Sequence, residues 1–217
     1  MRLAYRDHGG EGDAALLLHG LAGDSEEWAG TAEWLKERRR VVVFDARGHG
    51  QSERMPADVS RAAHVADAVF VIEQLELAPV ALIGQSLGGN TAMLAAAERP
   101  DLVAALVLAE AGPAEDPVAP AAVEEALLRW QDPPFDVDLL VRTLREAVGR
   151  SYWGEWERIE CPSLIVRASD GTLGADEAAQ MVERRPGTKL VEIADAGHDV
   201  HLDRPAEWRG VVTAFLG

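Results

Sequence analysis

The chain has 217 residues, of which 47% are apolar, and a net charge of −16. These values are typical of one globular domain with a single large core. The negative charge disfavours nucleic acid and anionic membrane surfaces as partners, and a solvated acidic surface is enough to explain it. The lone Cys161 excludes an internal disulfide, and the chain shows no signal-peptide core and no apolar run of membrane-spanning length, so we expect a cytoplasmic protein.

Short apolar runs alternate with longer segments of helical periodicity. This alternation is typical of the α/β class, with a mostly parallel central sheet and helices on both faces. The runs predict strands at 14–18, 41–44, 80–83, 102–108, 163–166 and 189–193, with a more polar edge strand at 2–6. Helices are predicted at 25–37, 60–76, 89–98, 175–183 and 205–215. In the second helix we expect Ser60 as N-cap, and an inward stripe of Ala63, Ala66, Val69, Phe70 and Leu75.

Residues 112–159 interrupt the alternation, because they contain five prolines, three tryptophans and no strand pattern. Short helices are predicted at 121–130 and 138–148. Since the segment is inserted between strands, we expect a small lid over the carboxyl ends of the sheet, where ligands bind in such folds. Its aromatic residues either line a substrate pocket or pack the lid onto the sheet: Trp130, Phe135, Tyr152, Trp153 and Trp156.

The pentapeptide Gly84-Gln85-Ser86-Leu87-Gly88 lies between a predicted strand and a predicted helix. That context predicts a nucleophile elbow, in which a sharp turn presents the serine at its apex. The flanking glycines leave room where a Cβ would collide with neighbouring backbone. The same turn places the Leu87 N–H at a helix N-terminus, beside the reacting carbonyl. The alternative interpretation is a glycine-rich turn with an incidental serine.

A serine nucleophile needs a base, and the base needs an orienting acid. His198 lies in the loop after the last predicted strand, where a base that reaches Ser86 has to originate. Asp170 follows the preceding strand and is the expected acid. Glu110, at the end of the strand before that, is the alternative acid, because it could reach the same histidine.

A second oxyanion donor is expected in the turn after the strand at 14–18, where the sequence reads His19-Gly20-Leu21-Ala22-Gly23. The N–H of Leu21 is the candidate, and with Leu87 it would stabilise a tetrahedral intermediate. His19 is expected to hold this loop by hydrogen bonds. The histidines are scattered and the cysteine is alone, so no metal site is predicted, and no cofactor motif is recognised.

With these motifs the chain resembles the α/β-hydrolase family nearly end to end. The matching residues occur in the family order: His19-Gly20, Asp45-x-Arg47-Gly48-His49-Gly50-x-Ser52, Gly84-x-Ser86-x-Gly88-Gly89, Asp170 and Gly197-His198. The resemblance implies one α/β-hydrolase domain over residues 1–217, a triad of Ser86, Asp170 and His198, and oxyanion donors at Leu21 and Leu87. Two departures matter: the acid region lacks the family's Gly-x-x-Asp pattern, which keeps Glu110 open, and the lid is short.

The combined prediction is a serine hydrolase that cleaves an ester, lactone or thioester of a small, largely apolar molecule through an acyl-enzyme on Ser86. Carbon–carbon bond hydrolysis and perhydrolysis by the same residues stay open, because the fold does not fix the reaction. A lyase or cyclase that uses Ser86 and His198 for proton transfer is a second class, and a non-catalytic ligand receptor is a third. No feature of the chain specifies its oligomeric state.

Overall fold

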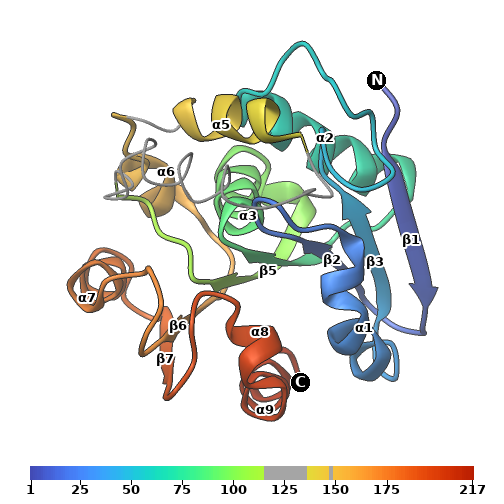
Figure 1. Cartoon of the computed structure of the whole chain (residues 1–217). Helices are drawn as coiled ribbons and strands as arrows, with labels where there is room; N and C mark the ends of the chain where they lie inside the picture. The colour runs from blue at the N-terminus through green and yellow to red at the C-terminus, as the bar shows by residue number, and fades with distance from the viewer. Residues whose placement is uncertain (115–135, 147–148) are drawn as a thin grey trace.

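The computed structural model describes residues 1–114, 136–146 and 149–217 (Figure 1). Within these ranges a seven-stranded sheet has the order β1-β3-β2-β4-β5-β6-β7. β1 pairs antiparallel with β3, and the other neighbours are parallel. The strands are β1 (Ala4–Gly9), β2 (Ala14–Leu18), β3 (Arg40–Asp45), β4 (Val80–Gln85), β5 (Val103–Ala109), β6 (Ser163–Ala168) and β7 (Lys189–Ile193). Each predicted strand is thus confirmed.

Helices cover both faces of this sheet (Figure 1). Their bounds are α1 (Ala29–Leu35), which follows the 3-10 turn η1 (Ser25–Trp28), then α2 (Arg61–Gln74), α3 (Leu87–Glu98), the 3-10 turn η2 (Pro100–Leu102), α5 (Val137–Arg145), α6 (Trp153–Arg158), α7 (Ala175–Arg184), α8 (Val200–Asp203) and α9 (Pro205–Leu216). The segments α6 and α8 were not predicted, since each is one or two turns long and shows no sustained apolar period. The predicted helix at 121–130 lies outside the described residues.

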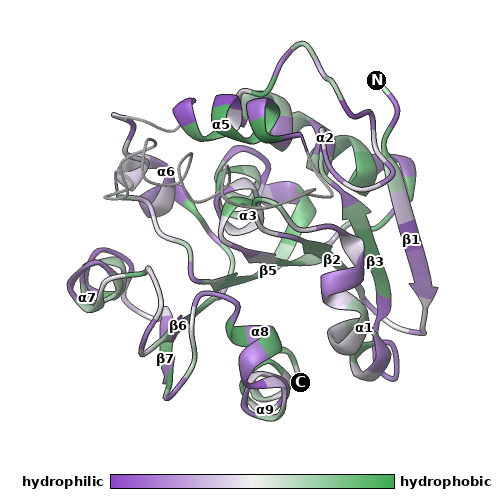
Figure 2. Cartoon of the chain, in the orientation of Figure 1, coloured by the Kyte–Doolittle hydropathy of each residue, from purple (hydrophilic) through white to green (hydrophobic). Residues whose placement is uncertain are grey.

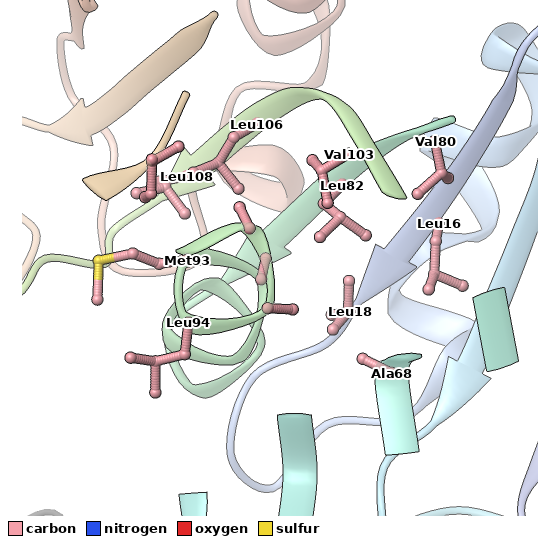
Figure 3. Packing of buried hydrophobic residues seen from close by; sticks show 14 of the residues in the cluster. Leu16, Leu18, Ala68, Val80, Leu82, Met93, Leu94, Val103, Leu106 and Leu108 are labelled. Atoms are coloured by element: carbon pink, nitrogen blue, oxygen red, sulfur yellow. The ribbon is translucent and has the colours of Figure 1, made fainter. Parts of the chain in front are cut away.

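Side chains of successive strand residues pack into two different cores, one on each face of the sheet, because they point alternately to the two faces. Leu16, Leu82 and Leu106 belong to the cluster that packs on α2, α3, α6 and α7. Their chain neighbours Leu17 and Ile83 belong to the opposite cluster, with residues of α1 and α9. Figure 3 shows the first cluster gathered around α3. Burial on both faces explains why the central strands read as continuous apolar runs.

The edge strand β1 differs from the central strands in polarity. Figure 2 shows it largely hydrophilic beside its apolar neighbour β3. Its side chains are mostly exposed or half-buried, and Tyr5 is 50% exposed. This agrees with the predicted edge position, since polar residues protect the unpaired edge of a sheet.

Helix α2 starts as predicted but is rotated relative to the predicted inward stripe. The Ser60 side chain accepts a hydrogen bond from the N–H of Ala63, which is the expected cap. Ala63 is buried, whereas Ala66 is exposed and Phe70 is 53% exposed. The prediction was wrong at these two positions, because the buried polar side chains of His64 and Asp67 occupy part of the inward face.

The parallel strands β4, β5, β6 and β7 end at the same edge of the sheet. Ser86, Glu110 and the loops that follow β6 and β7 therefore meet at one place. Among the described residues, no helix combines the length and the apolar character needed to cross a bilayer.

Candidate active site

Ser86 occupies the apex of a sharp turn between β4 and α3. Its backbone angles, φ 52° and ψ −118°, lie in a region that few non-glycine residues adopt. A Cβ on Gly84 would overlap the backbone of Gly88, and one on Gly88 would overlap the carbonyl groups at the end of β2. The Ser86 N–H donates to the Ala109 carbonyl at 3.0 Å, which fixes the turn to β5. The turn has the geometry predicted for a nucleophile elbow.

The turn after β2 lies directly against this elbow. The His19 ring contacts the Gly20 carbonyl through Nδ1 at 2.8 Å and accepts from the Ala46 N–H through Nε2 at 2.9 Å. His19 is buried and holds two loops together, as expected. A Cβ placed on Gly20 would lie 3.5 Å from the Cβ of Ser86. Within the described part of the chain, no acceptor lies within hydrogen-bond range of the Leu21 or Leu87 N–H. Among these residues, both N–H groups are therefore available as donors.

Gln85 connects the elbow to the loop that carries His198. Its buried side chain donates through Nε2 to the His198 carbonyl at 3.0 Å and to Asp199 Oδ1 at 3.1 Å. These bonds join residues more than a hundred positions apart. The loop after β7 is therefore fixed to the residue that immediately precedes Ser86.

His198 lies next to the carboxylate of Glu110. The Glu110 Oε2 atom is 3.6 Å from His198 Nδ1, and the Glu110 side chain is completely buried while that of His198 is 38% exposed. Glu110 follows β5 directly and has a positive φ of 52°, like Ser86. Strained residues of this kind concentrate at functional sites, so the ends of β4 and β5 together indicate a candidate functional site.

Main-chain donors hold the Glu110 carboxylate. Its Oε1 accepts from the Ala168 N–H at 2.6 Å, and its Oε2 accepts from the N–H groups of Thr172 and Leu173. Burial alone would raise the pKa of Glu110, but these donors and His198 lower it below its ordinary value. Glu110 therefore carries a negative charge at neutral pH, directed at the imidazole.

Asp170, the acid favoured from the sequence, is placed elsewhere. It is exposed, its carboxylate is 3.3 Å from the hydroxyl of its neighbour Ser169, and its N–H donates to the Ala196 carbonyl at 3.0 Å. Among the described residues, no hydrogen bond or ion pair joins its carboxylate to His198. The structure brings the alternative, Glu110, to the histidine instead, because the residue after β5 turns its side chain under the loop that contains Asp170.

A family model described as the alpha/beta hydrolase fold matches residues 14–155. The chain belongs to the α/β-hydrolase family. Among its relatives, the mouse sn-1-specific diacylglycerol lipase ABHD11 is 29% identical over an alignment that covers 95% of this chain and 83% of the relative. The (E)-2-((N-methylformamido)methylene)succinate hydrolase of Acinetobacter baylyi is 26% identical, with 99% and 94% covered. The solved enol-lactonase of Burkholderia xenovorans superposes with a TM-score of 0.85 at 22% identity, covering 99% and 96%.

In this α/β-hydrolase, the aromatic residues predicted for a substrate pocket fall into two groups. Trp130 and Phe135 lie outside the described residues. Trp156 is fully buried and donates through Nε1 to the Met181 carbonyl at 2.9 Å, and Trp153 and Tyr152 pack against the same core. The structure thus shows the packing alternative for these three residues.

The segment that follows Glu110 is tied to the helix that follows Ser86. Asn90, on the first turn of α3, donates through Nδ2 to the Gly112 carbonyl at 3.0 Å. Farther along, the Tyr152 N–H donates to the Pro113 carbonyl at 2.6 Å. The beginning and the end of the inserted segment are therefore close together beside α3.

A partly buried acid, Glu27, supports the turn after β2. Glu27 Oε1 accepts from the Gly20 N–H at 3.2 Å and lies 3.8 Å from Nε2 of His201, whose ring stacks on Trp28 with centroids 4.2 Å apart. Burial, with Asp199 and Asp24 adding to it, raises the pKa of Glu27 to about 8, and burial lowers the pKa of His201 to about 4. At neutral pH this is a contact between two uncharged groups rather than an ion pair.

A small cavity borders the elbow. His19, His64, Leu87 and Gly88 are among its lining residues, whereas Ser86 and His198 do not line it. Among the described residues, no group of three or more His, Cys, Asp or Glu side chains is arranged to hold a metal ion.

Three contributors to the site were missed from the sequence: Gln85, Glu27 and Thr172. Gln85 stood within the quoted motif, and its position beside Ser86 was the available signal. Glu27 and Thr172 carry no local pattern, because their roles depend on tertiary contacts with the Gly20 N–H and with Nδ1 of His198.

Proposed function

We propose that this α/β-hydrolase is a serine hydrolase in which Ser86 is the nucleophile, His198 the general base and Glu110 the acid that orients the base. The observation that carries the proposal is the contact between the buried Glu110 carboxylate and His198. Gln85 fixes the histidine loop to the elbow, which supports a direct approach of the imidazole to Ser86. A nucleophile, a base and an orienting acid are the groups that acyl transfer requires.

The proposed substrate is an ester, lactone or thioester of a small, largely apolar molecule. Ser86 Oγ bonds to the acyl carbon while its proton passes to Nε2 of His198. The Leu21 and Leu87 N–H groups then stabilise the oxyanion, helped by the positive end of α3. When the bond to the leaving oxygen or sulfur breaks, the imidazolium returns the proton to the leaving group. Water attacks the acyl-enzyme by the same route and releases the carboxylic acid.

Two further observations support hydrolysis as the reaction class. Two relatives whose sequences align over most of this chain are named as a lipase and a succinate-derivative hydrolase, while a third, from Bacillus subtilis, is named as a putative carboxylate synthase. The two candidate oxyanion donors lack acceptors within the described part of the chain. Under this proposal residues 112–159 form a small lid over the serine, within one domain.

A fluorophosphonate probe tests the nucleophile directly. We expect covalent labelling that maps to Ser86 by mass spectrometry and is lost in Ser86→Ala, because only an activated serine reacts at a useful rate. Absence of labelling in the folded wild-type protein would overturn the proposal. A second arm uses p-nitrophenyl butyrate: an acyl adduct on Ser86, trapped at early times, distinguishes the hydrolase from a lyase or cyclase that uses the same pair for proton transfer.

A further inference from the structure

The hydroxyl of Thr172 lies between the acid and the base. Thr172 Oγ1 is 2.8 Å from His198 Nδ1 and 3.4 Å from Glu110 Oε2. The direct distance from Nδ1 to Oε2 is 3.6 Å, which exceeds the usual range for an N–H···O hydrogen bond. The imidazole therefore has its short polar contact with the hydroxyl rather than with the carboxylate.

We propose that Thr172 is a positioning residue that links His198 to Glu110: its hydroxyl accepts from Nδ1–H and donates to Oε2. This inference rests on the proposed function, because it assigns to Thr172 the tautomer and orientation of the base. A hydroxyl has one proton to donate and can accept as well, so it satisfies both neighbours at once.

The direction of these bonds follows from the charge of Glu110. An ionised carboxylate only accepts, and a hydrogen bond to a charged acceptor is stronger than one to a neutral acceptor. The Thr172 proton therefore goes to Oε2, and the oxygen lone pairs face Nδ1. This arrangement keeps the imidazole proton on Nδ1 and leaves the Nε2 lone pair free to take the proton of Ser86.

The backbone around Thr172 supports the same role. The Thr172 N–H donates to the Oε2 atom that its own hydroxyl approaches. One residue thus holds the acid through its main chain and contacts the base through its side chain. The main-chain contact persists in any substitution except proline, so the hydroxyl can be removed without releasing Glu110.

Thr172→Val and Thr172→Ser form a matched pair. Valine keeps the shape and the backbone donor but removes the hydroxyl, whereas serine keeps the hydroxyl. We expect Thr172→Val to reduce the rate of fluorophosphonate labelling of Ser86 by about tenfold or more, the effect of one hydrogen bond on the barrier, and Thr172→Ser to stay within about threefold of wild type. With p-nitrophenyl acetate the loss should appear in kcat, with KM nearly unchanged.

A pH profile separates positioning from shape. The hydroxyl accepts more strongly from imidazolium than from neutral imidazole, so its removal should move the rising limb of labelling in Thr172→Val to lower pH. Thr172→Ala serves as a second variant without the hydroxyl, and thermal unfolding checks that all variants fold.

The inference is overturned if Thr172→Val labels at the wild-type rate with the wild-type pH profile. It is also overturned if serine and valine slow labelling equally, because the effect would then be one of shape. Failure of the wild-type protein to label Ser86 would instead remove the proposed function itself, and the inference with it.

Discussion

The carboxylate of Glu110 lies against the Cα of Gly171, so that a Cβ at position 171 would overlap both oxygens and the carboxyl carbon. The acid and the loop after β6 therefore share one volume. Glu110 fits only because position 171 carries no side chain.

Gly171→Ala should displace Glu110 from His198. We expect labelling of Ser86 to fall by about tenfold or more, since a misplaced orienting group raises the barrier even when the nucleophile is intact. Gly174→Ala is the matched control, because it lies in the same loop with open space where its Cβ would stand and should label at the wild-type rate. Equal labelling rates in Gly171→Ala and Gly174→Ala would contradict the claim that a side chain at position 171 displaces Glu110.

Substitution of the two candidate acids separates their roles. Glu110→Gln should lower kcat with p-nitrophenyl acetate by ~10³, by analogy with replacement of a triad acid by its amide. Asp170→Asn should stay within about twofold, because Asp170 is exposed and its carboxylate contacts Ser169 instead. Steady-state kinetics decide between them. A large loss of kcat in Asp170→Asn alone would show that Asp170 is the orienting acid.

Glu27 should make the stability of the protein fall as pH rises. Its pKa is raised from 4.5 to about 8 on folding, chiefly by burial, so the folded state binds a proton that the unfolded state releases between these values. The free energy of unfolding therefore falls with rising pH, and the loss is complete above about pH 8. Glu27→Gln should remove this pH dependence. Between pH 5 and 9, its free energy of unfolding should therefore rise relative to that of wild type by on the order of a few kcal/mol.

Urea unfolding at several pH values checks this result. The control is Glu26→Gln, whose carboxylate is 61% exposed and pairs with Arg6 at the surface, so little change is expected. A difference between Glu27→Gln and wild type that does not vary with pH would show that Glu27 is ionised in the folded protein.

The buried pair of Arg47 and Asp67 should tolerate loss of one partner poorly. The guanidinium donates to both carboxylate oxygens at 2.7 Å, and both residues are buried. Burial raises the pKa of Asp67 even beside Arg47, so the pair itself adds little to stability. Asp67→Asn still leaves an unpaired buried cation, and we expect a loss of about 3 kcal/mol in urea unfolding.

An exposed pair supplies the comparison for this prediction. Glu73→Gln breaks the surface contact with Arg99 and should cost less than about 1 kcal/mol. Joint replacement by Arg47→Met and Asp67→Leu should lose less than Asp67→Asn alone. If Asp67→Asn is as stable as wild type, the bonds that Arg47 already donates to the carbonyls of Asp58 and Ala63 are sufficient to hold the guanidinium, and the prediction is wrong.

Much of the fold could be predicted because its signals are local. Each central strand is buried on both faces and is therefore an apolar run in the sequence, and Ser60 marks the start of α2 as its N-cap. The phase of α2 could not be read from apolarity alone. Its inward face includes His64 and Asp67, which are buried through contacts with other elements, while Phe70 faces solvent.

The site divides in the same way. The elbow and its glycines form a continuous motif, and His198 follows a strand in a recognisable loop. The choice between Asp170 and Glu110 depended on which strand end directs a carboxylate at the imidazole, which is a property of three dimensions. The sequence did contain one indication. If Ala168 stands at the glycine position of the family pattern Gly-x-x-Asp, then Gly171 stands at its aspartate position. The absence of a side chain at Gly171 is what makes room for Glu110.

The position of Glu110 also affects how the inserted segment can vary. Ser86 and Glu110 lie at the ends of β4 and β5, which are neighbours joined by α3, and both precede residues 112–159. With the acid after β6, a change in that segment would fall between nucleophile and acid in the chain. Here it falls after both, anchored by Asn90 at Gly112. Residues 112–159 can therefore change in length without altering the separation along the chain between Ser86 and Glu110.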